Sequence, residues 1–415
     1  MVEKKRVVIL GAGFGGLLTA LTLARKNYNG EIVLVDVRDH HTYSPWLYEV
    51  ATGFISHGGA LAGIIMRNSA SFSIREIIKP YQQLRFRQGL VNALEIHDQY
   101  VVFEDGHTLR YDQLVVSLGS EPEFYNIEGL ADHALMLKTV PEALMVRDRI
   151  DDLVKKLENS EYKLGRIVIG GAGATGVETA SELVNSINCH CEKLKLCHGK
   201  IEVTLLEAGP NVLGPFPSVL QKWALKRMIE LGVNVQTNTV ITKVESDNLI
   251  TKEGNIPFDL CIWTGGVRPN SILSTWGIPK DARGRIIVDE YLKVTGLENV
   301  YALGDNTAFT DKNTDKLAPG TAWVAMRQGK LLGDNLSRLS LGQLLKPFNL
   351  PKHYPAVMAV GGKFAVATVG GFHFKNVIAF LLRQVIDLHY FLAIFPFWRA
   401  LKFWWQGTKV FEKND

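Results

Sequence analysis

The sequence is poor in cysteine and has no long uncharged apolar run. Four cysteines among 415 residues argue against a disulfide framework and for a cytosolic setting. No stretch of 18 uncharged apolar residues is present, so an ordinary membrane-spanning helix is not predicted. No signal peptide is predicted either, because the first apolar run, at residues 7–10, already reads as a core strand.

The chain also lacks a strong excess of charge of one sign. Its 46 basic and 42 acidic residues leave a net charge of +4, and no basic run is interleaved with aromatic residues. A nucleic-acid partner is therefore not expected. The length predicts two or three domains with sizeable cores.

A glycine motif near the N-terminus organises the first part of the chain. Residues 7–10 are an unbroken aliphatic run, which predicts a parallel strand buried on both faces. A G-x-G-x-x-G motif follows at Gly11, Gly13 and Gly16 and opens a helix whose N-terminus suits a pyrophosphate. Asp36 ends the next apolar strand, twenty residues after Gly16, where a carboxylate accepts hydrogen bonds from a ribose diol.

The same pattern recurs in the middle of the chain. A second G-x-G-x-x-G lies at Gly171, Gly173 and Gly176, between an apolar strand and a helix. Glu207 ends the following strand, 31 residues beyond Gly176, and we interpret residues 186–200 as an insertion that accounts for the surplus. Two such units predict two dinucleotide sites. A carboxylate at position 207 favours NADH over NADPH, because it repels a 2′-phosphate.

The predicted fold class is α/β, with two Rossmann-like dinucleotide-binding domains and a C-terminal amphipathic helical region. Other strands end in glycines that belong at the same sheet edges as the two motifs, namely Gly119, Gly265, Gly266 and Gly304. Asp305 follows the last of these and is a candidate acceptor for sugar or ribityl hydroxyls.

These stretches together resemble the two-dinucleotide flavoproteins, and specifically the type II NADH dehydrogenases, the single-subunit NADH:quinone oxidoreductases. The resemblance runs over nearly the whole chain and is carried by residues 11–16, 43–53, 171–178, 206–207, 264–267 and 304–305 and by the aromatic C-terminal tail. It implies an FAD-binding domain formed by residues 1–120 and 268–340, an NAD-binding domain at 121–267, and a C-terminal region at 341–415 whose membrane-anchor helices begin at about 376.

The resemblance also implies the residues of each site. The FAD site is expected to comprise Gly11, Gly13, Phe14, Gly16, Asp36, Pro45, Gly119, Gly304, Asp305, Ala322 and Trp323. The NADH site is expected to comprise Gly171, Gly173, Thr175, Gly176, Glu178, Glu207, Gly265 and Gly266. The quinone is expected at Trp323, Arg327 and Gln328.

One stretch departs from the family pattern. The family carries Ala-Gln-x-Ala-x-Gln after the Gly-Asp strand, whereas residues 322–327 read Ala-Trp-Val-Ala-Met-Arg. Both glutamines that line the family's quinone site are therefore replaced. Two alternatives stay open: an NADH-dependent reductase of a non-quinone acceptor, and a slow-turnover, redox-responsive protein that binds FAD and NADH.

Glu178 is the candidate catalytic residue. It lies two residues past Gly176, in the first turn of the predicted helix, where the helix dipole favours its charged form. In the resembled family this acid lies near the nicotinamide and the flavin, and a quinone must take up two protons as well as two electrons. The alternative is a capping carboxylate without a catalytic role.

The cysteines suggest other chemistries, which we weigh against the sequence. Cys189, Cys191 and Cys197 lie close together, but their spacing fits no standard zinc site and we predict no metal. Residues 39–57 contain no cysteine, which argues against thiol–disulfide exchange near the second strand. Sulfide:quinone reductases use two well-separated cysteines, and Cys261 is the only distant one here.

The C-terminal tail is expected to attach the protein to a membrane. Pro396 divides residues 376–411 into two helices, and Ile378, Leu381, Leu382, Val385 and Leu388 or His389 form an apolar stripe. The tail mixes tryptophans with basic residues, as at membrane interfaces: Trp398, Trp404, Trp405, Arg399, Lys402 and Lys409. An in-plane anchor fits, and a homodimer interface or a buried helix pair is the alternative. The expected protein is a peripheral enzyme of the respiratory chain, homodimeric, on the cytoplasmic side of the cell membrane.

Overall fold

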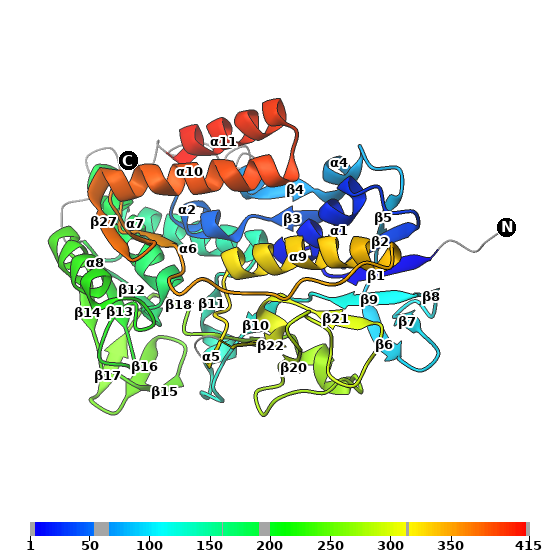
Figure 1. The fold of residues 1–415 in the computed structure, drawn as a ribbon. Coiled ribbons are helices and arrows are strands. Elements are labelled where there is room, and N and C mark those ends of the chain that lie inside the picture. Colours follow the sequence, from blue (N-terminus) through cyan, green and yellow to red (C-terminus); the bar gives the residue numbers. More distant parts are fainter. Residues whose placement is uncertain (1–4, 54–65, 160, 191–199, 313–314, 412–415) are drawn as a thin grey trace. The chain divides into compact units, whose positions relative to one another are not determined.

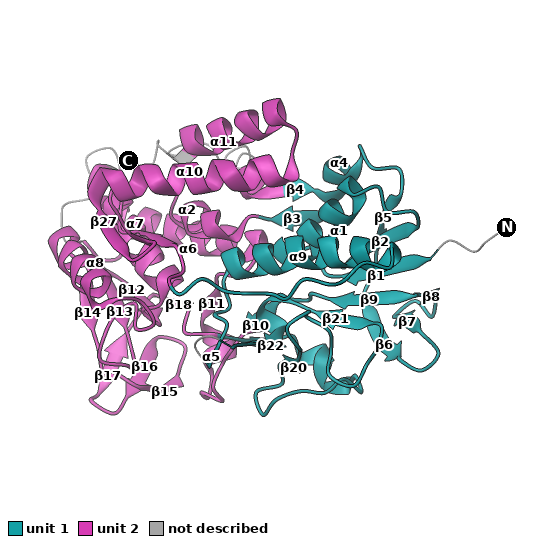
Figure 2. Cartoon of the chain, in the orientation of Figure 1, with its two compact units in different colours: residues 1–42, 72–121, 267–352 teal, residues 43–71, 122–266, 353–415 magenta. Residues whose placement is uncertain are grey.

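The computed structural model describes residues 5–53, 66–159, 161–190, 200–312 and 315–411. The chain divides into two compact units, each assembled from three segments (Figure 2). Unit 1 comprises residues 1–42, 72–121 and 267–352, and unit 2 comprises residues 43–71, 122–266 and 353–415. The grouping of residues 43–71 with unit 2 was not anticipated from the sequence.

Unit 1 is built on a five-stranded parallel sheet in the order β21-β9-β1-β2-β5. The strands are β1 (Arg6–Leu10), β2 (Glu31–Asp36), β5 (Leu84–Gln88), β9 (Gln113–Val116) and β21 (Val300–Ala302). The central strand β1 is apolar from Val7 to Leu10 because it is buried on both faces. The chain order reverses beside β1, and ligands bind at such switch points of open α/β sheets.

Two helices of unit 1, α1 (Phe14–Arg25) and α9 (Ala322–Ser340), pack closely along their length. Glycines allow this approach: a Cβ on Gly329 would lie 2.3 Å from the Gly15 carbonyl oxygen, and one on Gly333 would lie 2.7 Å from the Thr19 oxygen. Unit 1 also contains α4 (Ile74–Ile78) and the antiparallel strands β6 (Val91–Glu95), β7 (Tyr100–Phe103) and β8 (Thr108–Arg110).

Unit 2 repeats the parallel sheet, in the order β11-β18-β12-β13-β14. Its strands are β11 (Leu135–Met136), β12 (Gly165–Gly170), β13 (Ile201–Leu206), β14 (Asn234–Gln236) and β18 (Leu260–Trp263). Its helices include α6 (Val140–Glu158), α7 (Ala174–His190) and α8 (Ser218–Leu231). Helix α6 begins at a capping box in which Thr139 and Glu142 bond each other's backbone N–H groups. Both predicted Rossmann-like sheets are thus present.

Unit 2 also contains two small antiparallel sheets and a short helix. The first sheet comprises β15 (Ile241–Val244), β16 (Asn248–Thr251) and β17 (Asn255–Pro257). The second comprises β25 (Ala356–Ala359), β26 (Ala365–Val369) and β27 (Phe372–Lys375) and packs against the C-terminal helix α10 (Asn376–Ile394). The short helix α2 (Leu47–Thr52) lies just after residue 43, where the chain passes from unit 1 to unit 2, and it packs on α6 and α7.

Two helices end the described chain, α10 (Asn376–Ile394) and α11 (Phe397–Phe411), and they lie side by side (Figure 1). The break falls at Pro396, as predicted. The inner face of α10 buries two charged side chains, Arg383 and Asp387, among apolar and aromatic ones. Its outer face is apolar and exposed: Ile378 and Val385 are 62% and 63% exposed. By length and composition alone, α10 is long and apolar enough to cross a membrane.

Candidate functional site: paired phosphate loops and a carboxylate cluster

The first glycine motif forms a tight loop between β1 and α1. Gly11 has a φ of +98°, and a Cβ there would lie 2.3 Å from the Ser117 carbonyl oxygen. A Cβ on Gly16 would lie 2.0 Å from the Gly11 oxygen, so both glycines are required by the fold itself. Gly13 differs, because a Cβ on it would meet nothing within 4 Å.

The second motif, between β12 and α7, has the same three environments. Gly171 has a φ of +96°, and a Cβ on Gly176 would lie 1.9 Å from the Gly171 oxygen. A Cβ on Gly173 would meet nothing within 4 Å. The middle glycine of each motif therefore faces open space at a helix N-terminus, where a pyrophosphate needs close backbone approach. Both loops fit a dinucleotide on this test.

The acids at the ends of β2 and β13 hold these loops in place. Asp36 Oδ2 accepts the Ala12 backbone N–H at 2.7 Å, and Glu207 Oε2 accepts the Ala172 N–H at 2.8 Å. The other oxygen of Glu207 accepts the Gly209 N–H at 2.8 Å. Since a carboxylate offers about four lone-pair positions, both acids keep capacity for a ribose hydroxyl. The sequence predicted the ribose role but not the loop-holding role.

His41 also holds the glycine loop of unit 1, because it binds the carbonyl oxygen of Ala12, whose N–H donates to Asp36. Its Nδ1 lies 2.8 Å from the Ala12 carbonyl oxygen, and its ring meets the Phe14 ring edge-on at 5.3 Å. Complete burial lowers the pKa of His41 to about 4, so the ring is neutral and Nδ1–H donates to the carbonyl. Sequence reasoning did not single out His41, since one histidine after a strand carries no specific signal.

The carboxyl ends of β9 and β21 meet through a polar link. The Gly119 backbone N–H donates to Asn306 Oδ1 at 3.0 Å, and the Ser120 hydroxyl donates to Asp305 Oδ2 at 2.7 Å. Gly304 adopts a φ of +78° at this turn. The structure therefore brings three of the predicted FAD residues, Gly119, Gly304 and Asp305, to one edge of the sheet.

Helix α9 begins at Ala322 beside this edge, and its first turns carry the residues predicted for the quinone. The Arg327 guanidinium lies 4.9 Å from the centroid of the Trp323 ring, a cation–π distance. Gln328 is 1% exposed, and its Oε1 accepts the Gly304 N–H at 2.8 Å. Gln328 therefore has a structural partner, and its assignment to the quinone remains a prediction.

The remaining residues predicted for NADH surround the loop of unit 2. Thr175 lies in the first turn of α7, and its carbonyl accepts the Thr179 hydroxyl at 2.7 Å. Gly265 and Gly266 follow β18, next to Gly171, and Gly266 has a φ of +148°. The structure thus gathers the predicted set at the carboxyl end of one sheet.

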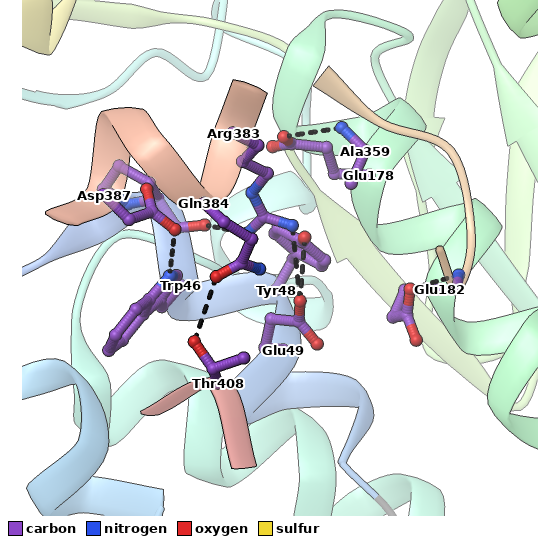
Figure 3. Close-up of polar contacts among 12 residues, drawn as sticks. Trp46, Tyr48, Glu49, Glu178, Glu182, Ala359, Arg383, Gln384, Asp387 and Thr408 are labelled. Carbon is purple, nitrogen blue, oxygen red and sulfur yellow. Dashed lines mark hydrogen bonds and ion pairs between the residues drawn. The ribbon is translucent and has the colours of Figure 1, made fainter. Parts of the chain in front are cut away.

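A cluster of acids and one arginine lies between α2, α7 and α10 (Figure 3). Arg383 Nη1 lies 3.4 Å from Glu49 Oε1, and the guanidinium lies 5.0 Å from the centroid of the Tyr48 ring. Its Nη2 donates to the Pro45 carbonyl at 3.4 Å. Pro45, predicted for FAD, therefore binds α10 through its backbone, and the same arginine holds the start of α2.

Asp387 holds the same segment one turn further along α10. Its two oxygens accept the Tyr43 hydroxyl at 2.6 Å and the Trp46 indole N–H at 3.0 Å. Asp387 is 2% exposed and Arg383 6% exposed. Sequence reasoning missed both, although two charges spaced by four residues in an apolar helix do lie on one face.

Glu178, the candidate catalytic residue, lies at the edge of this cluster. Its Oε1 accepts a long hydrogen bond of 3.3 Å from the Ala359 N–H of β25. The residue is only partly exposed, and burial of its carboxyl raises the pKa to about 7, against the opposing charge of Arg383. The prediction that the helix dipole favours its charged form is therefore wrong, because the effect of burial is larger. A carboxyl that titrates near neutral pH suits general acid–base chemistry.

The cysteines do not form a reactive site in the described part of the chain. Cys261 is buried in β18, and burial raises the pKa of its thiol to about 12, which makes it unreactive. Cys189 is exposed, whereas Cys191 and Cys197 lie outside the described residues. Among described residues, no group of three or more histidines, cysteines, aspartates and glutamates is placed to hold a metal ion.

Two Rossmann-like units, each with a phosphate loop and a loop-holding acid, define a protein that binds two dinucleotides. The chain belongs to the pyridine nucleotide-disulphide oxidoreductase family, whose profile matches residues 5–329. The predicted fold class is confirmed.

Known relatives and solved structures agree with this assignment. The type II NADH:quinone oxidoreductase of Staphylococcus saprophyticus is 28% identical over 399 residues, covering 93% of this chain and 94% of the relative. The enzyme of the same name from Staphylococcus aureus is 28% identical over 396 residues, with the same coverage. The fold is similar to NDH2 from Plasmodium falciparum in complex with NADH, with a TM-score of 0.82, 18% identity and coverage of 99% and 97%. It is also similar to the sulfide:quinone oxidoreductase of Aquifex aeolicus, with a TM-score of 0.76, 17% identity and coverage of 96% and 92%.

Proposed function

We propose that the chain is an FAD-dependent NADH:quinone oxidoreductase that does not pump protons. The observation that carries this proposal is the duplicated loop, because each copy has an open middle glycine and an acid bound to the loop. One copy serves FAD and the other NADH. The staphylococcal relatives bear this activity in their names and align over 93% of the chain.

The overall reaction balances as NADH, quinone and one proton giving NAD⁺ and quinol. FAD, when bound, would supply the two-electron chemistry, with N5 as the acceptor of the hydride and the quinone as the acceptor of the two electrons. The chain holds FAD with the loop of unit 1, Asp36 and the edge formed by Gly119, Gly304 and Asp305. It holds NADH with the loop of unit 2 and Glu207.

Glu178 is proposed to hold a proton for the quinone. The quinone takes up two electrons and two protons, of which one proton derives from the hydride of NADH and one from solution. Burial raises the pKa of the Glu178 carboxyl to about 7, where it both gives and regains a proton readily. Its weak hydrogen bonding supports this role, since the one bond that it accepts within the described part of the chain, from Ala359, is 3.3 Å long. A carboxylate that only capped the helix would not need to be buried with so little stabilisation of its charge by hydrogen bonds.

Stopped-flow absorbance of the flavin tests the proposal on the full-length, FAD-loaded protein. NADH is mixed in first, followed by ubiquinone or menaquinone analogues. We expect fast bleaching by NADH and fast recovery with a quinone. Fast bleaching with slow recovery for every quinone would overturn the quinone assignment and favour another acceptor. The presence of Trp323 and Arg327 in place of the two glutamines of the family pattern would then explain this result.

Coenzyme preference is expected to depend on Glu207. Glu207→Arg removes the charge that repels a 2′-phosphate, so the preference for NADH over NADPH should fall by roughly tenfold or more. Because Glu207 also holds the Ala172 N–H, Glu207→Gln is the matched control that keeps an acceptor without charge, and its preference should be intermediate. The ratio of kcat/KM values for the two coenzymes measures this effect. An unchanged ratio in Glu207→Arg would contradict the assignment.

Membrane attachment is proposed to occur through the outer face of α10 together with α11. Apolar side chains crowd that face, and Trp398 of α11 is 79% exposed. An exposed apolar surface of this kind marks a site of membrane or protein contact. The chain then reaches its quinone at the membrane surface.

Polar substitutions on this face are expected to release the protein from membranes. The double variant Ile378→Gln with Val385→Gln should bind phospholipid vesicles about tenfold or more weakly, because each apolar side chain contributes about 1.5–3 kcal/mol when buried. Ile229, which is 60% exposed on α8, offers the control substitution Ile229→Gln. Vesicle co-sedimentation measures binding, and equal retention of both proteins would place the contact elsewhere.

The resemblance supports two further parts of the proposal. The chain is proposed to work as a homodimer and to attach to the cytoplasmic face of the cell membrane. Light scattering of the detergent-solubilised protein tests the first, and protease accessibility in right-side-out and inverted vesicles tests the second.

A further inference from the structure

Helix α10 carries two buried charged side chains, which attachment to a membrane alone would not require. Its outer face is apolar, yet its inner face buries Arg383 and Asp387 against α2. These two side chains hold the segment around α2 through hydrogen bonds and an ion pair. Their charges also act on the neighbouring carboxyl of Glu178.

The cluster holds more acids than cations. Among the described residues, the guanidinium of Arg383 interacts electrostatically with three carboxylates, those of Glu49, Glu178 and Asp387. Full ionisation would leave two uncompensated negative charges in a poorly solvated site, which is costly. One carboxyl of the three is therefore expected to hold a proton near neutral pH.

The hydrogen bonds indicate which carboxyl that is. Asp387 accepts bonds from Tyr43 and Trp46, and Glu49 accepts the Tyr48 hydroxyl at 2.9 Å and contacts Arg383. Among the described residues, Glu178 accepts one bond, the long one from Ala359. Within this described part of the chain it accepts the fewest hydrogen bonds of the three carboxylates, and it is the most exposed of them, whereas burial also raises the pKa of Asp387 against the bonds from Tyr43 and Trp46.

We propose that Arg383 and Asp387 are positioning residues of the proton site, so that the C-terminal helix takes part in the proton chemistry of quinone reduction as well as in attachment. Arg383 pairs with Glu49, and Asp387 accepts hydrogen bonds from Tyr43 and Trp46. The proton of the cluster is thereby left on Glu178. The inference rests on the proposed proton role of Glu178. It adds that the charge on the inner face of α10 sets how readily that proton is held.

The neighbours of Glu178 predict two shifts of opposite sign. Arg383 and Asp387 act on it from α10 and Glu49 acts from α2, whereas Glu182, one turn along α7, accepts the Gly362 N–H at 3.0 Å. Arg383→Gln removes a cation and should raise the pH at which Glu178 loses its proton by about one unit or more. Asp387→Asn removes an anion and should lower that pH by about one unit.

Infrared spectroscopy of the full-length, FAD-loaded protein tests this without turnover. The carbonyl band of a protonated carboxylic acid is followed against pH and assigned by its loss in Glu178→Gln. We expect a wild-type midpoint at about 7, opposite shifts in Arg383→Gln and Asp387→Asn, and a near-wild-type midpoint in Arg383→Lys. Gln384→Ala is the packing control, because Gln384 Oε1 accepts the Thr408 hydroxyl of α11 at 3.0 Å and carries no charge.

The outcomes separate this inference from the proposed function. Shifts in the same direction, or none, would overturn the role of α10 even if the enzyme reduces quinone. Absence of quinone reduction in stopped flow would overturn the proposed function while leaving the band midpoints as evidence on the charges. If Arg383→Gln fails to fold, Glu49→Gln replaces it, since loss of that anion should also lower the midpoint, and an unmoved midpoint in both acid variants would overturn the inference.

Discussion

Replacing Glu178 by glutamine is expected to slow quinone-dependent reoxidation of the flavin by about a hundredfold or more, while bleaching by NADH stays within a fewfold of wild type. A positioned acid contributes about 10²–10⁴-fold to a proton transfer. Stopped flow separates the two half-reactions directly. Glu182→Gln, which changes a buried acid one turn along the same helix, is the matched control and should reoxidise normally. A loss confined to bleaching by NADH would instead assign Glu178 to the nicotinamide.

The pH dependence of the same step should follow the protonation of Glu178. Its carboxyl is protonated below a pKa of about 7, so wild-type reoxidation should fall as the pH rises through that value, and Glu178→Gln should lose this limb. Stability gives an independent check. A raised pKa means that the folded state binds the proton more tightly than the unfolded state, so the free energy of unfolding falls between the ordinary pKa of 4.5 and about 7. The glutamine variant should gain up to about 3 kcal/mol relative to wild type between pH 4 and pH 8.

Two glycines of one motif are expected to give opposite results when each is changed to alanine. Gly16→Ala should destabilise unit 1 by about 3 kcal/mol or more, because its Cβ would lie 2.0 Å from the Gly11 carbonyl oxygen and the backbone would have to move. Gly13→Ala should leave the thermal midpoint of the flavin-free protein unchanged, since its Cβ meets nothing within 4 Å. The same methyl group should weaken FAD binding by about tenfold or more, because it occupies space that the pyrophosphate needs.

Flavin content after purification and the melting curve of the flavin-free protein measure the two effects. Gly173→Ala is the matched control in unit 2, where it should raise the KM for NADH and leave the flavin content intact. Full retention of FAD by Gly13→Ala would contradict the placement of the pyrophosphate at this loop. A stable Gly16→Ala protein would contradict the packing argument.

Much of the fold was predictable because its strongest signals are local. The apolar strands, the two glycine motifs and the break at Pro396 each follow from a few adjacent residues, and the structure has them where the sequence placed them. Strands β25–β27 were not predicted, since they are short and partly exposed and depend on packing against α10. The inclusion of residues 43–71 in unit 2 is likewise a tertiary feature that no local pattern encodes.

The candidate site was predictable in its cofactor loops but not in its supporting contacts. Asp36 and Glu207 were placed at the correct loops, yet their bonds to Ala12 and Ala172 depend on how each loop folds back onto its strand. The sequence did not predict the contacts of Arg383 and Asp387, because the strongest local signal of this helix is its apolar stripe. Their partners on α2 lie more than 330 residues away in the chain, at separations of 334 and 344 residues for Glu49 and Tyr43.

The two buried charges of α10 have a consequence for any redesign of the C-terminal region. Truncation before residue 376 would remove the hydrogen bonds and the ion pair that Arg383 and Asp387 make with Glu49, Tyr43 and Trp46. Resurfacing is the better route. Polar substitutions restricted to the outer positions of α10 leave every one of those bonds in place, so the protein should tolerate a redesigned exterior far better than a shortened chain.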